Sequence, residues 1–409
     1  MKIGFYGNAN NYPFMLARAV QRLGHEVVFL IASRERLNRP ENLYGEITLP
    51  YPPWIIDVSH RFRWHCLVPG LGRHKVLEQL NACDAVILNE EGPALAPQLR
   101  VPYAVLLTGS DVEVFANPAL AASLRPQAFK RPVWARDLSR RILPVSLILR
   151  QLIRPQRAGI KGASTVAFLP EGLVPNADRL LKEIGVTPEQ RIGVQFTDCG
   201  LAPYTPPALN ATVRIFSATR LTWLAEPGTG LTPLDLKGSD IMLRGLGEFW
   251  RKTRQPLDIH LVKKGRHVAQ TMELAAQLEL TDQITWHEEM NQREVLVQFR
   301  AADIVFEQLG QSAVGMAGLD AMSTGRPLIA NGRPEIFEPL TGQSSPIRQA
   351  RTAEAVCAQL TELVFSSPKR LKVGLASRGY VEAHFSAESA ARRLVTALAG
   401  SANSMPGHS

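Results

Sequence analysis

Short apolar runs of strand type alternate with amphipathic helical stretches along most of this chain, and this alternation constrains its fold more than any other feature. The first unit of the pattern is a strand over residues 2–6, a helix over 12–23 and a second strand over 26–31. Strands that alternate with helices favour parallel sheets over sandwiches and helix bundles, because a parallel connection needs a crossover segment. The sequence therefore predicts an α/β protein built from βαβ units.

Similar units follow in two groups, which the proline-rich stretch 202–207 separates. The chain has 409 residues, which is enough for two domains of typical size. We expect two doubly wound Rossmann-like domains facing a central cleft, with ligands bound beyond the carboxyl ends of the strands. The further strands are expected at 84–88, 103–107, 164–168, 213–218, 257–262, 283–286, 303–306 and 327–330, and helices of the second group at 240–252 and 269–278.

Composition excludes several classes of protein. Hydrophobic residues make up 45% of the chain, yet no apolar run approaches the roughly 20 residues of a membrane span. The first residues lack the order of a secretory signal, which favours a cytoplasmic protein. The cysteines show neither CxxC nor CxxxH spacing, so we expect buried thiols rather than a zinc site or a disulfide framework. They are Cys66, Cys83, Cys199 and Cys357.

The stretch 301–327, AADIVFEQLGQSAVGMAGLDAMSTGRP, carries the most functional information. It has the pattern of a buried strand, a loop with Gly310 and Gly315, and a helix that begins near Val314. Amide groups and the positive end of the dipole at a helix start attract an anion, and Asp320 further along could accept hydrogen bonds from sugar hydroxyls. The stretch therefore indicates a nucleotide site, while the same glycines would also suit an ordinary strand-loop-helix turn.

Several motifs follow one another in a recognisable order. They are Arg220, Lys237-Gly-Ser-Asp, the strand Ile259-His-Leu-Val with Gly265, the loop after Asp303, and Asp320-Ala-Met-Ser-Thr-Gly-Arg-Pro-Leu-Ile. In order and approximate spacing they resemble the donor domain of retaining GT-B glycosyltransferases of the family 4 type. The N-terminal half resembles this family more loosely, through Gly7-Asn-Ala-Asn-Asn, the Gly24-His-Glu-Val turn and Thr108-Gly-Ser-Asp.

This resemblance implies a GT-B fold with a division of the chain into four parts. An N-terminal acceptor-side domain would cover 1–207, and a nucleotide-sugar donor domain would cover 208–375. Residues 376–400 would form helices that cross back to the first domain. Residues 401–409 are small and polar, so we expect a disordered tail.

The resemblance also implies how the donor is held without a metal ion. Arg220 and Lys237 match the basic pair that contacts the donor pyrophosphate, whose negative charge increases as the glycosidic bond breaks. The chain lacks DxD-type paired carboxylates, although Asp198 and Asp235 remain open as metal ligands. We therefore expect no metal and no cofactor besides the nucleotide diphosphate sugar. The alternative for the two cations is an ordinary solvated surface role.

Other donor-site positions depart from the family pattern. Asp320 matches the second glutamate of an acidic pair, which holds the ribose hydroxyls, whereas Ser312 replaces the first glutamate, which contacts the donor sugar. Glu307 and Gln308 at the strand end could supply a substitute polar contact, and Gly315 would let the phosphates approach the loop. The alternative for Glu307 is a solvated residue that caps the strand.

In the N-terminal half, Gly7, Asn8 and Asn10 follow the first strand and could contact the donor phosphates or the acceptor. A plain turn is the alternative, since glycine and asparagine favour turns. Asp111 in Thr108-Gly-Ser-Asp could orient the acceptor hydroxyl or act as a base, or it could be a helix N-cap. We assign His25 a structural role.

Positive charge is concentrated in one segment of a chain whose net charge is +9. Residues 125–161 contain ten Lys or Arg against one acid, Asp137, interleaved with bulky aliphatic residues. This composition is typical of peripheral membrane contact and would suit a lipid-linked acceptor. The alternatives are a buried helix with a solvated basic edge or a nucleic-acid patch. Few aromatic residues accompany these charges, which argues against nucleic acid.

The sequence thus predicts a retaining, metal-independent glycosyltransferase that moves a sugar from a nucleotide diphosphate sugar to a glycan or lipid-linked glycan. No nucleophilic carboxylate is evident, so the resemblance favours front-face transfer in which the leaving phosphate helps to take the acceptor proton. Two alternatives stay open. One is a non-catalytic nucleotide-sugar-binding protein of the same fold. The other is an enzyme of the sugar-nucleotide 2-epimerase type, for which only His287-Glu-Glu offers acid and base groups.

Overall fold

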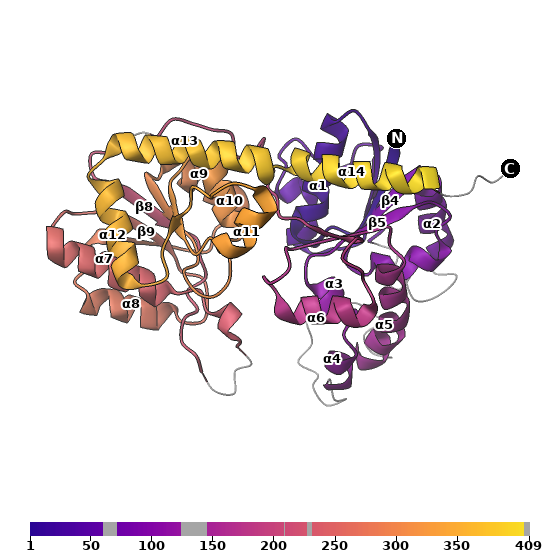
Figure 1. Ribbon diagram of the computed structural model, residues 1–409, viewed down its shortest axis with the longest axis horizontal. Helices are drawn as coiled ribbons and strands as arrows, with labels where there is room; N and C mark the ends of the chain where they lie inside the picture. Colours follow the sequence, from indigo (N-terminus) through magenta and orange to yellow (C-terminus); the bar gives the residue numbers. More distant parts are fainter. Residues whose placement is uncertain (60–71, 124–144, 208, 227–230, 405–409) are drawn as a thin grey trace. The chain divides into compact units, whose positions relative to one another are not determined.

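The computed structural model describes residues 1–59, 72–123, 145–207, 209–226 and 231–404 (Figure 1). The chain forms two compact units: unit 1 comprises Met1–Gln195 with Ala387–Ser409, and unit 2 comprises Phe196–Ser386. These boundaries differ from the expected ones at 207 and 375. The first differs because the proline-rich segment packs within unit 2, and the second because one unbroken helix extends past residue 375.

Unit 1 is built on a sheet of parallel strands, in the order β3-β2-β1-β4-β5-β6-β7 within the described residues. The order departs from β1 in both directions, so the sheet is doubly wound and its switch point lies between β1 and β4. The strands are β1 (Lys2–Tyr6), β2 (Glu26–Ile31), β3 (Ile55–Asp57), β4 (Ala85–Leu88), β5 (Tyr103–Leu106), β6 (Thr165–Phe168) and β7 (Arg191–Gly193).

Helices cover both faces of this sheet, and the last helix of the chain belongs to this unit. It packs against the first helix, where Arg22 Nε and Glu388 Oε1 form an ion pair at 2.6 Å. It also continues to Ser404, into the segment expected to be disordered, because small residues readily extend a helix that is already formed. The helices are α1 (Tyr12–Arg22), α2 (Arg73–Asn81), α3 (Ser110–Glu113), α4 (Pro118–Ser123), α5 (Val145–Lys161), α6 (Pro175–Ile184) and α14 (Ala387–Ser404).

Unit 2 repeats this architecture with a second parallel sheet, ordered β10-β9-β8-β11-β12-β13 where the structure describes the chain. One group of helices contains α7, α8 and α12, and another contains α9, α10 and α13. The strands are β8 (Arg214–Ser217), β9 (Asp258–Val262), β10 (Ile284–His287), β11 (Ile304–Phe306), β12 (Leu328–Ala330) and β13 (Arg348–Gln349). The helices are α7 (Ser239–Thr253), α8 (Val268–Gln277), α9 (Gln292–Ala301), α10 (Met316–Ser323), α11 (Pro334–Thr341), α12 (Ala353–Val364) and α13 (Ser367–His384).

The proline-rich stretch 202–207 packs within unit 2. The ring of Tyr204 lies so close to Gly325 that a Cβ atom there would come within 2.4 Å of it. The guanidinium of Arg326 is fully buried and donates a hydrogen bond to the carbonyl oxygen of Thr205 at 2.8 Å. These contacts make the segment part of a folded core.

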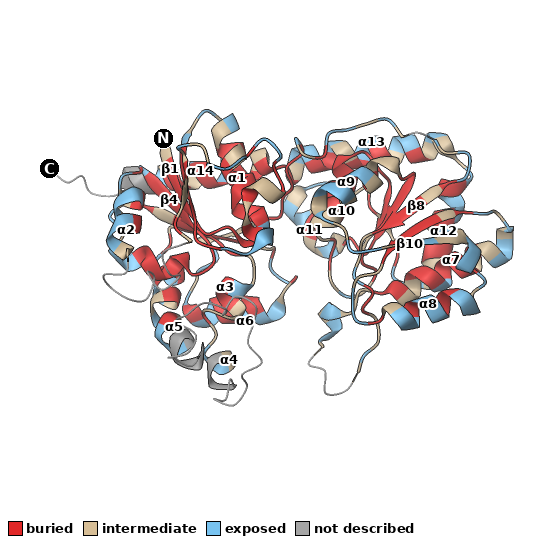
Figure 2. Ribbon diagram, turned by 180° about the vertical axis from the view of Figure 1, so that it is seen from behind, coloured by how far each residue is buried: buried red, intermediate tan, exposed pale blue. Residues whose placement is uncertain are grey.

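Buried residues concentrate along the strands and the inward faces of the helices in each unit (Figure 2). Within the described residues, Cys83, Cys199 and Cys357 are buried free thiols, as expected, and Cys66 lies outside those residues. The strands expected from the sequence are all present with small shifts at their ends. The α/β fold prediction is therefore confirmed, and the parallel sheets place the loops of both units at the carboxyl ends of their strands.

Candidate functional site

Loops of unit 2 meet backbone against backbone at the carboxyl ends of β8, β9 and β11. A Cβ atom on Gly310 would fall 2.0 Å from the carbonyl oxygen of Leu236, and one on Gly265 would fall 2.6 Å from the Leu221 nitrogen. Gly238 has a φ of +73° and lies against the backbone of Gly310. Only glycine permits this packing, which fixes the two loops that carry Arg220 and Lys237.

Arg220 and Lys237, which the sequence resemblance assigns to the donor pyrophosphate, lie in these adjoining loops. Arg220 is exposed, whereas Lys237 is half-buried and its Nζ donates to the carbonyl oxygen of Leu234 at 3.1 Å. Burial lowers the pKa of Lys237, and the nearby Arg220 lowers it further, while Glu307 and Asp235 oppose the shift. Two cations that influence each other in this way form a ready site for a polyanion.

Glu307 follows β11 and reaches the start of α10. Its Oε2 accepts a hydrogen bond from the Gly315 amide at 3.1 Å, and Gly315 is the N-cap residue of that helix. Burial raises the pKa of Glu307 to about 7, although the amides of Gly315 and Gln308 and the charge of Lys237 oppose this rise. The side chain is partly buried and its carboxyl group is bound to a helix terminus, which a purely solvated strand cap does not describe.

Side-chain amides hold the loop between β11 and α10. Asn331 Nδ2 donates to the carbonyl oxygens of Gly310 at 2.7 Å and Ser312 at 3.4 Å. Gln308 is buried and donates to the carbonyl oxygen of Ala313, while its Oε1 has no hydrogen-bond partner. The helix begins at Met316, two residues later than the pattern near Val314 predicts. Ser312 is partly exposed in this loop.

Asp320 lies within α10 and is 4% exposed. Its Oδ1 accepts a hydrogen bond from Thr197 Oγ1, and its Oδ2 accepts one from Gln292 Nε2 at 3.3 Å. Burial raises the pKa of Asp320 to about 6, and the negative charge of Asp198 acts in the same direction. Both carboxylate oxygens are thus engaged inside unit 2.

His267 is a residue of this site that the sequence does not reveal, because nothing in a lone histidine before a helix indicates its contacts. It is fully buried, and its Nδ1 accepts hydrogen bonds from the amides of Trp223 at 3.0 Å and Leu224 at 3.2 Å. Its own amide donates to the Leu221 carbonyl oxygen at 2.8 Å. His267 therefore holds the loop that follows Arg220.

His287, the alternative acid or base, is the last residue of β10 and contacts other side chains of the sheet. Its Nε2 lies 2.7 Å from His260 Nδ1, and the two rings stack at 5.0 Å. His260 Nε2 in turn lies 2.9 Å from Asp258 Oδ1. These contacts place His287 in a side-chain cluster on the edge of the sheet.

In unit 1, Gly7 and Asn8 follow β1 in a tightly bonded loop. Gly7 has a φ of +87°, and a Cβ there would fall 2.6 Å from the Asn89 carbonyl oxygen. Asn8 is fully buried, and its Nδ2 donates to Asn11 Oδ1 at 2.7 Å and to the Asn38 carbonyl oxygen at 2.9 Å. Its own amide donates to Glu90 Oε2 at 3.1 Å. The loop is more than a plain turn, since its polar atoms join strand ends that lie far apart in sequence.

Asp111 lies on the same edge of the sheet, within α3, and is fully buried. Its Oδ1 accepts hydrogen bonds from the amides of Thr108 at 2.8 Å and Gly109 at 2.9 Å, and its Oδ2 accepts one from Asn89 Nδ2 at 3.0 Å. Burial raises the pKa of Asp111 to about 6, against the effect of these backbone amides. The N-cap interpretation is wrong, because Gly109 occupies the cap and Asp111 binds the residues that precede the helix.

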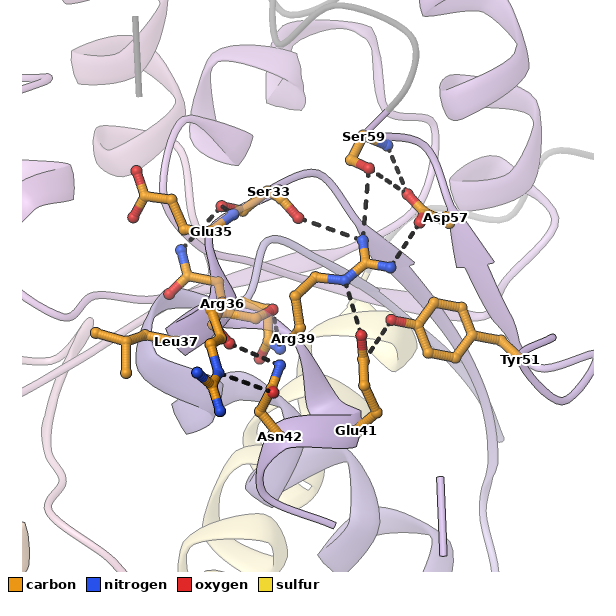
Figure 3. Close-up of polar contacts among 12 residues, drawn as sticks. Ser33, Glu35, Arg36, Leu37, Arg39, Glu41, Asn42, Tyr51, Asp57 and Ser59 are labelled. Carbon is orange, nitrogen blue, oxygen red and sulfur yellow. Dashed lines mark hydrogen bonds and ion pairs between the residues drawn. The ribbon is translucent and has the colours of Figure 1, made fainter. Parts of the chain in front are cut away.

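A charged cluster supports the neighbouring loop after β2 (Figure 3). Arg39 Nη2 pairs with Asp57 at 2.8 Å and its Nε with Glu41 at 3.3 Å, while Tyr51 donates its hydroxyl to Glu41 at 2.6 Å. Hydrogen bonds from Arg39 and Ser59 hold the pKa of Asp57 below its usual value even though burial acts to raise it. The cluster is absent from the sequence interpretation, since its members come from separate loops.

The basic segment lies partly outside the described residues, including Arg140 and Arg141. In α5, Arg150 and Arg154 are exposed while Leu152 is buried. Arg157 donates instead to backbone carbonyl oxygens within unit 1.

In the part of the chain that the structure describes, no helix is both long and apolar enough to cross a membrane. Over these same residues, no three His, Cys, Asp or Glu side chains are grouped to hold a metal ion.

No family model matches this chain, and none of the curated proteins is significantly similar to it in sequence. Solved structures match it over nearly its whole length. HepE of Anabaena in complex with UDP and glucose is 13% identical with a TM-score of 0.59, over 98% of this chain and 100% of HepE. A glycosyltransferase from Rickettsia africae ESF-5 is 12% identical with a TM-score of 0.59, over 99% of each chain.

The lipopolysaccharide outer core galactosyltransferase WaaB is 12% identical with a TM-score of 0.55, over 98% of this chain and 100% of WaaB. At such identities the likeness concerns the fold. The chain has the α/β fold of the GT-B glycosyltransferases, with two doubly wound parallel sheets.

Proposed function

We propose that this protein is a retaining, metal-independent glycosyltransferase that moves a sugar from a nucleoside diphosphate sugar to a glycan or lipid-linked glycan. The observation that carries the proposal is the pairing of Arg220 with Lys237 in adjoining loops of unit 2. The fold supports it, and so do the complexes of HepE with UDP and UDP-glucose, which suggest a similar donor here.

The two cations would act on the leaving group. As the bond between sugar and diphosphate breaks, negative charge grows on the phosphate, and Arg220 and Lys237 stabilise that charge. Lys237 is half-buried, so its attraction to a phosphate is screened less than that of a surface lysine. In front-face transfer the departing phosphate itself takes the acceptor proton, and catalysis rests on positioning.

The remaining candidate residues, Asp320 and Asp111, would bind the donor or position the backbone of the site. Each carboxylate oxygen of Asp320 accepts one hydrogen bond, from Thr197 or Gln292, and keeps a further acceptor site for a ribose hydroxyl. Asp111 is too deeply buried to abstract a proton directly, so we assign it the positioning of the amides of Thr108 and Gly109.

The acceptor side is assigned to unit 1. A lipid-linked acceptor would bring the protein to the cytoplasmic face of a membrane, and the exposed Arg150 and Arg154 of α5 would contact anionic headgroups there. Leu152 is buried, so this contact would be electrostatic and would not insert the described part of the helix into the bilayer. Vesicle flotation tests the contact.

The decisive experiment replaces the two cations separately. In Arg220→Ala and Lys237→Ala, sugar transfer should fall by roughly 10²–10³-fold, the usual effect of removing one donor to a developing anion. Transfer is measured as nucleotide release in EDTA, with UDP-, GDP- and ADP-sugars and cell extract as acceptor. Lys252→Ala, an exposed cation of α7, is the control and should behave as wild type. Undiminished turnover in both active-site variants would refute the assignment.

A non-catalytic nucleotide-sugar-binding protein is the second candidate. Ser312 stands where the family has a glutamate, and each carboxylate oxygen of Asp111 and Asp320 already accepts a hydrogen bond from an internal partner. Thermal stabilisation by a nucleotide sugar without any release of nucleotide would favour this candidate.

A further inference from the structure

The N-terminus of α10 already binds a carboxyl group that the protein itself supplies. Glu307 Oε2 accepts the Gly315 amide at 3.1 Å, and the other carboxylate oxygen lies 3.5 Å from where a Cβ on Gly315 would be. Gly315 has an extended backbone and opens a helix of eight residues. A phosphate oxygen of the donor would use the same amide and the same end of the helix dipole.

A second observation also points to a ligand at this place. Gln308 is 6% exposed, and its Oε1 has no hydrogen-bond partner. Its Nε2 lies 3.9 Å from the Cβ position of Gly315, so this carboxamide borders the same amide. A buried acceptor without a partner is costly unless a bound donor completes it, and a hydroxyl of the donor sugar is such a group, whereas a phosphate oxygen is not.

We propose that Glu307 is a built-in competitor for the donor diphosphate, occupying the Gly315 amide in the free protein and giving it up when a nucleoside diphosphate sugar binds. This inference rests on the proposed function and specifies how that site admits its substrate. The carboxyl group released from Gly315 is then available to a hydroxyl of the donor sugar, the contact that Ser312 cannot make as a glutamate would.

The charge of Glu307 affects how readily a diphosphate replaces it at the Gly315 amide. An ionised Glu307 beside an incoming diphosphate would be a like charge in a poorly solvated site, so binding favours the neutral, protonated carboxyl. The pKa of Glu307 is about 7 in the free protein, and burial is its main cause. Each binding event therefore takes up a fraction of a proton that increases with pH above 7.

Other charged groups around Glu307 must be separated from this effect. The loop before α7 contributes Lys237, whose pKa is lowered by burial, and Arg220 and Asp235 act on Lys237 in turn. Loss of the Lys237 proton at high pH would weaken binding in the same direction. A variant that removes only the Glu307 charge separates the pH dependence due to Glu307 from the pH dependence due to Lys237.

The experiment measures the affinity of UDP-glucose by calorimetry between pH 6 and pH 8 without metal, because its diphosphate does not ionise in that range. The dissociation constant of the wild type should rise about tenfold across this range, as expected for one required proton with a pKa near 7. At pH 8 the wild type should take up close to one proton, read from buffers of different ionisation enthalpy.

Glu307→Gln should bind UDP-glucose about tenfold more tightly than wild type at pH 8, with most of the pH dependence removed. Glu307→Asp keeps the charge but is too short to reach the Gly315 amide, so at pH 8 it should bind UDP-glucose more tightly than the wild type and less tightly than Glu307→Gln. Glu248→Gln is the matched control, since Glu248 is a half-buried carboxyl of α7 that pairs with Lys252 on the same helix. It should keep the wild-type profile.

The outcomes separate this inference from the proposed function. If wild type and Glu307→Gln bind with the same affinity and the same pH profile, the inference is overturned while the donor site stands. If neither binds UDP-glucose, GDP-mannose or ADP-glucose at any pH, the proposed function fails and the inference fails with it. Binding by Glu307→Gln alone would support competition directly, as would proton uptake by the wild type that Glu307→Gln lacks.

Discussion

At the scale of single residues, three carboxyl groups stand out because the fold raises their pKa. Burial raises the pKa of Asp111 and Asp320 to about 6 and that of Glu307 to about 7. A carboxyl that binds its proton more tightly in the folded chain stabilises the fold at low pH, and this contribution is lost as pH rises through the folded pKa. The contribution of these three groups to the free energy of unfolding should therefore fall between about pH 4 and pH 7.

Asp111 gives the sharpest test of this behaviour. Between the ordinary pKa of 3.8 and the folded value of about 6, its ionisation should remove roughly 3 kcal/mol from the free energy of unfolding. Asp111→Asn should flatten that part of the profile, measured by urea unfolding from pH 4 to 7. Glu35→Gln, an exposed acid of the same unit, should keep the wild-type slope. An unchanged slope in Asp111→Asn would show that burial does not control this carboxyl.

The polar residues of unit 1 show where sequence reasoning ends. Gly7 and Asn8 attract attention because both residue types mark a turn after a strand. The sequence does not indicate a role for Asn38, Asn89 and Glu90, because their contacts form only when the fold brings three strand ends together. Asn38 Nδ2 donates to Glu90 at 3.3 Å, and Asn89 Oδ1 accepts a hydrogen bond from the Ala9 amide at 2.9 Å. No local pattern encodes such contacts.

At the scale of elements, glycines determine how closely the loops of unit 2 approach. Gly310→Ala would place a Cβ 2.0 Å from the Leu236 carbonyl oxygen, so the loop that carries Lys237 must shift. We expect a loss of about 1–3 kcal/mol in stability and weaker nucleotide binding. Gly379→Ala is the matched control, because this exposed glycine lies inside α13 with open space around its Cβ position. This substitution should increase the free energy of unfolding by about 0.5–1 kcal/mol.

Thermal unfolding and nucleotide affinity of the two glycine variants provide the measurement. Equal effects of both substitutions would show that the approach of these loops does not control the site.

Prediction of the elements succeeded where the pattern is local and long enough. The expected strands at 2–6 and 26–31 coincide with β1 and β2, because their apolar runs end in clear turn residues. Strands β3, β7 and β13 escaped prediction because their short sequences, IID, RIG and RQ, contain charged or polar residues, whereas the equally short β11 and β12 are wholly apolar. Such strands form only because a neighbouring strand offers its edge, and sequence periodicity does not record this.

At the scale of the whole molecule, the chain builds two units with the same plan and divides its chemistry between them. Unit 2 contains Arg220, Lys237 and the N-terminus of α10. The order of motifs along the sequence was enough to indicate these features. Unit 1 contains buried carboxyl and carboxamide networks together with the basic segment. The chain returns from unit 2 to unit 1 through α14, so the first unit is complete only when the last helix has been made.

The concentration of charge in unit 1 leads to the prediction on membranes. Vesicles that contain anionic lipid should bind the protein at low salt and release it at high salt, because each Lys or Arg near such a surface contributes about 1 kcal/mol that salt screens. Replacing Arg140, Arg141, Arg150 and Arg154 with Ser should largely abolish flotation. The control removes the same charge from exposed positions of unit 2, at Arg251, Lys252, Arg351 and Lys372. Equal losses in both variants would assign the binding to net charge alone, and no flotation of the wild type would end the membrane proposal.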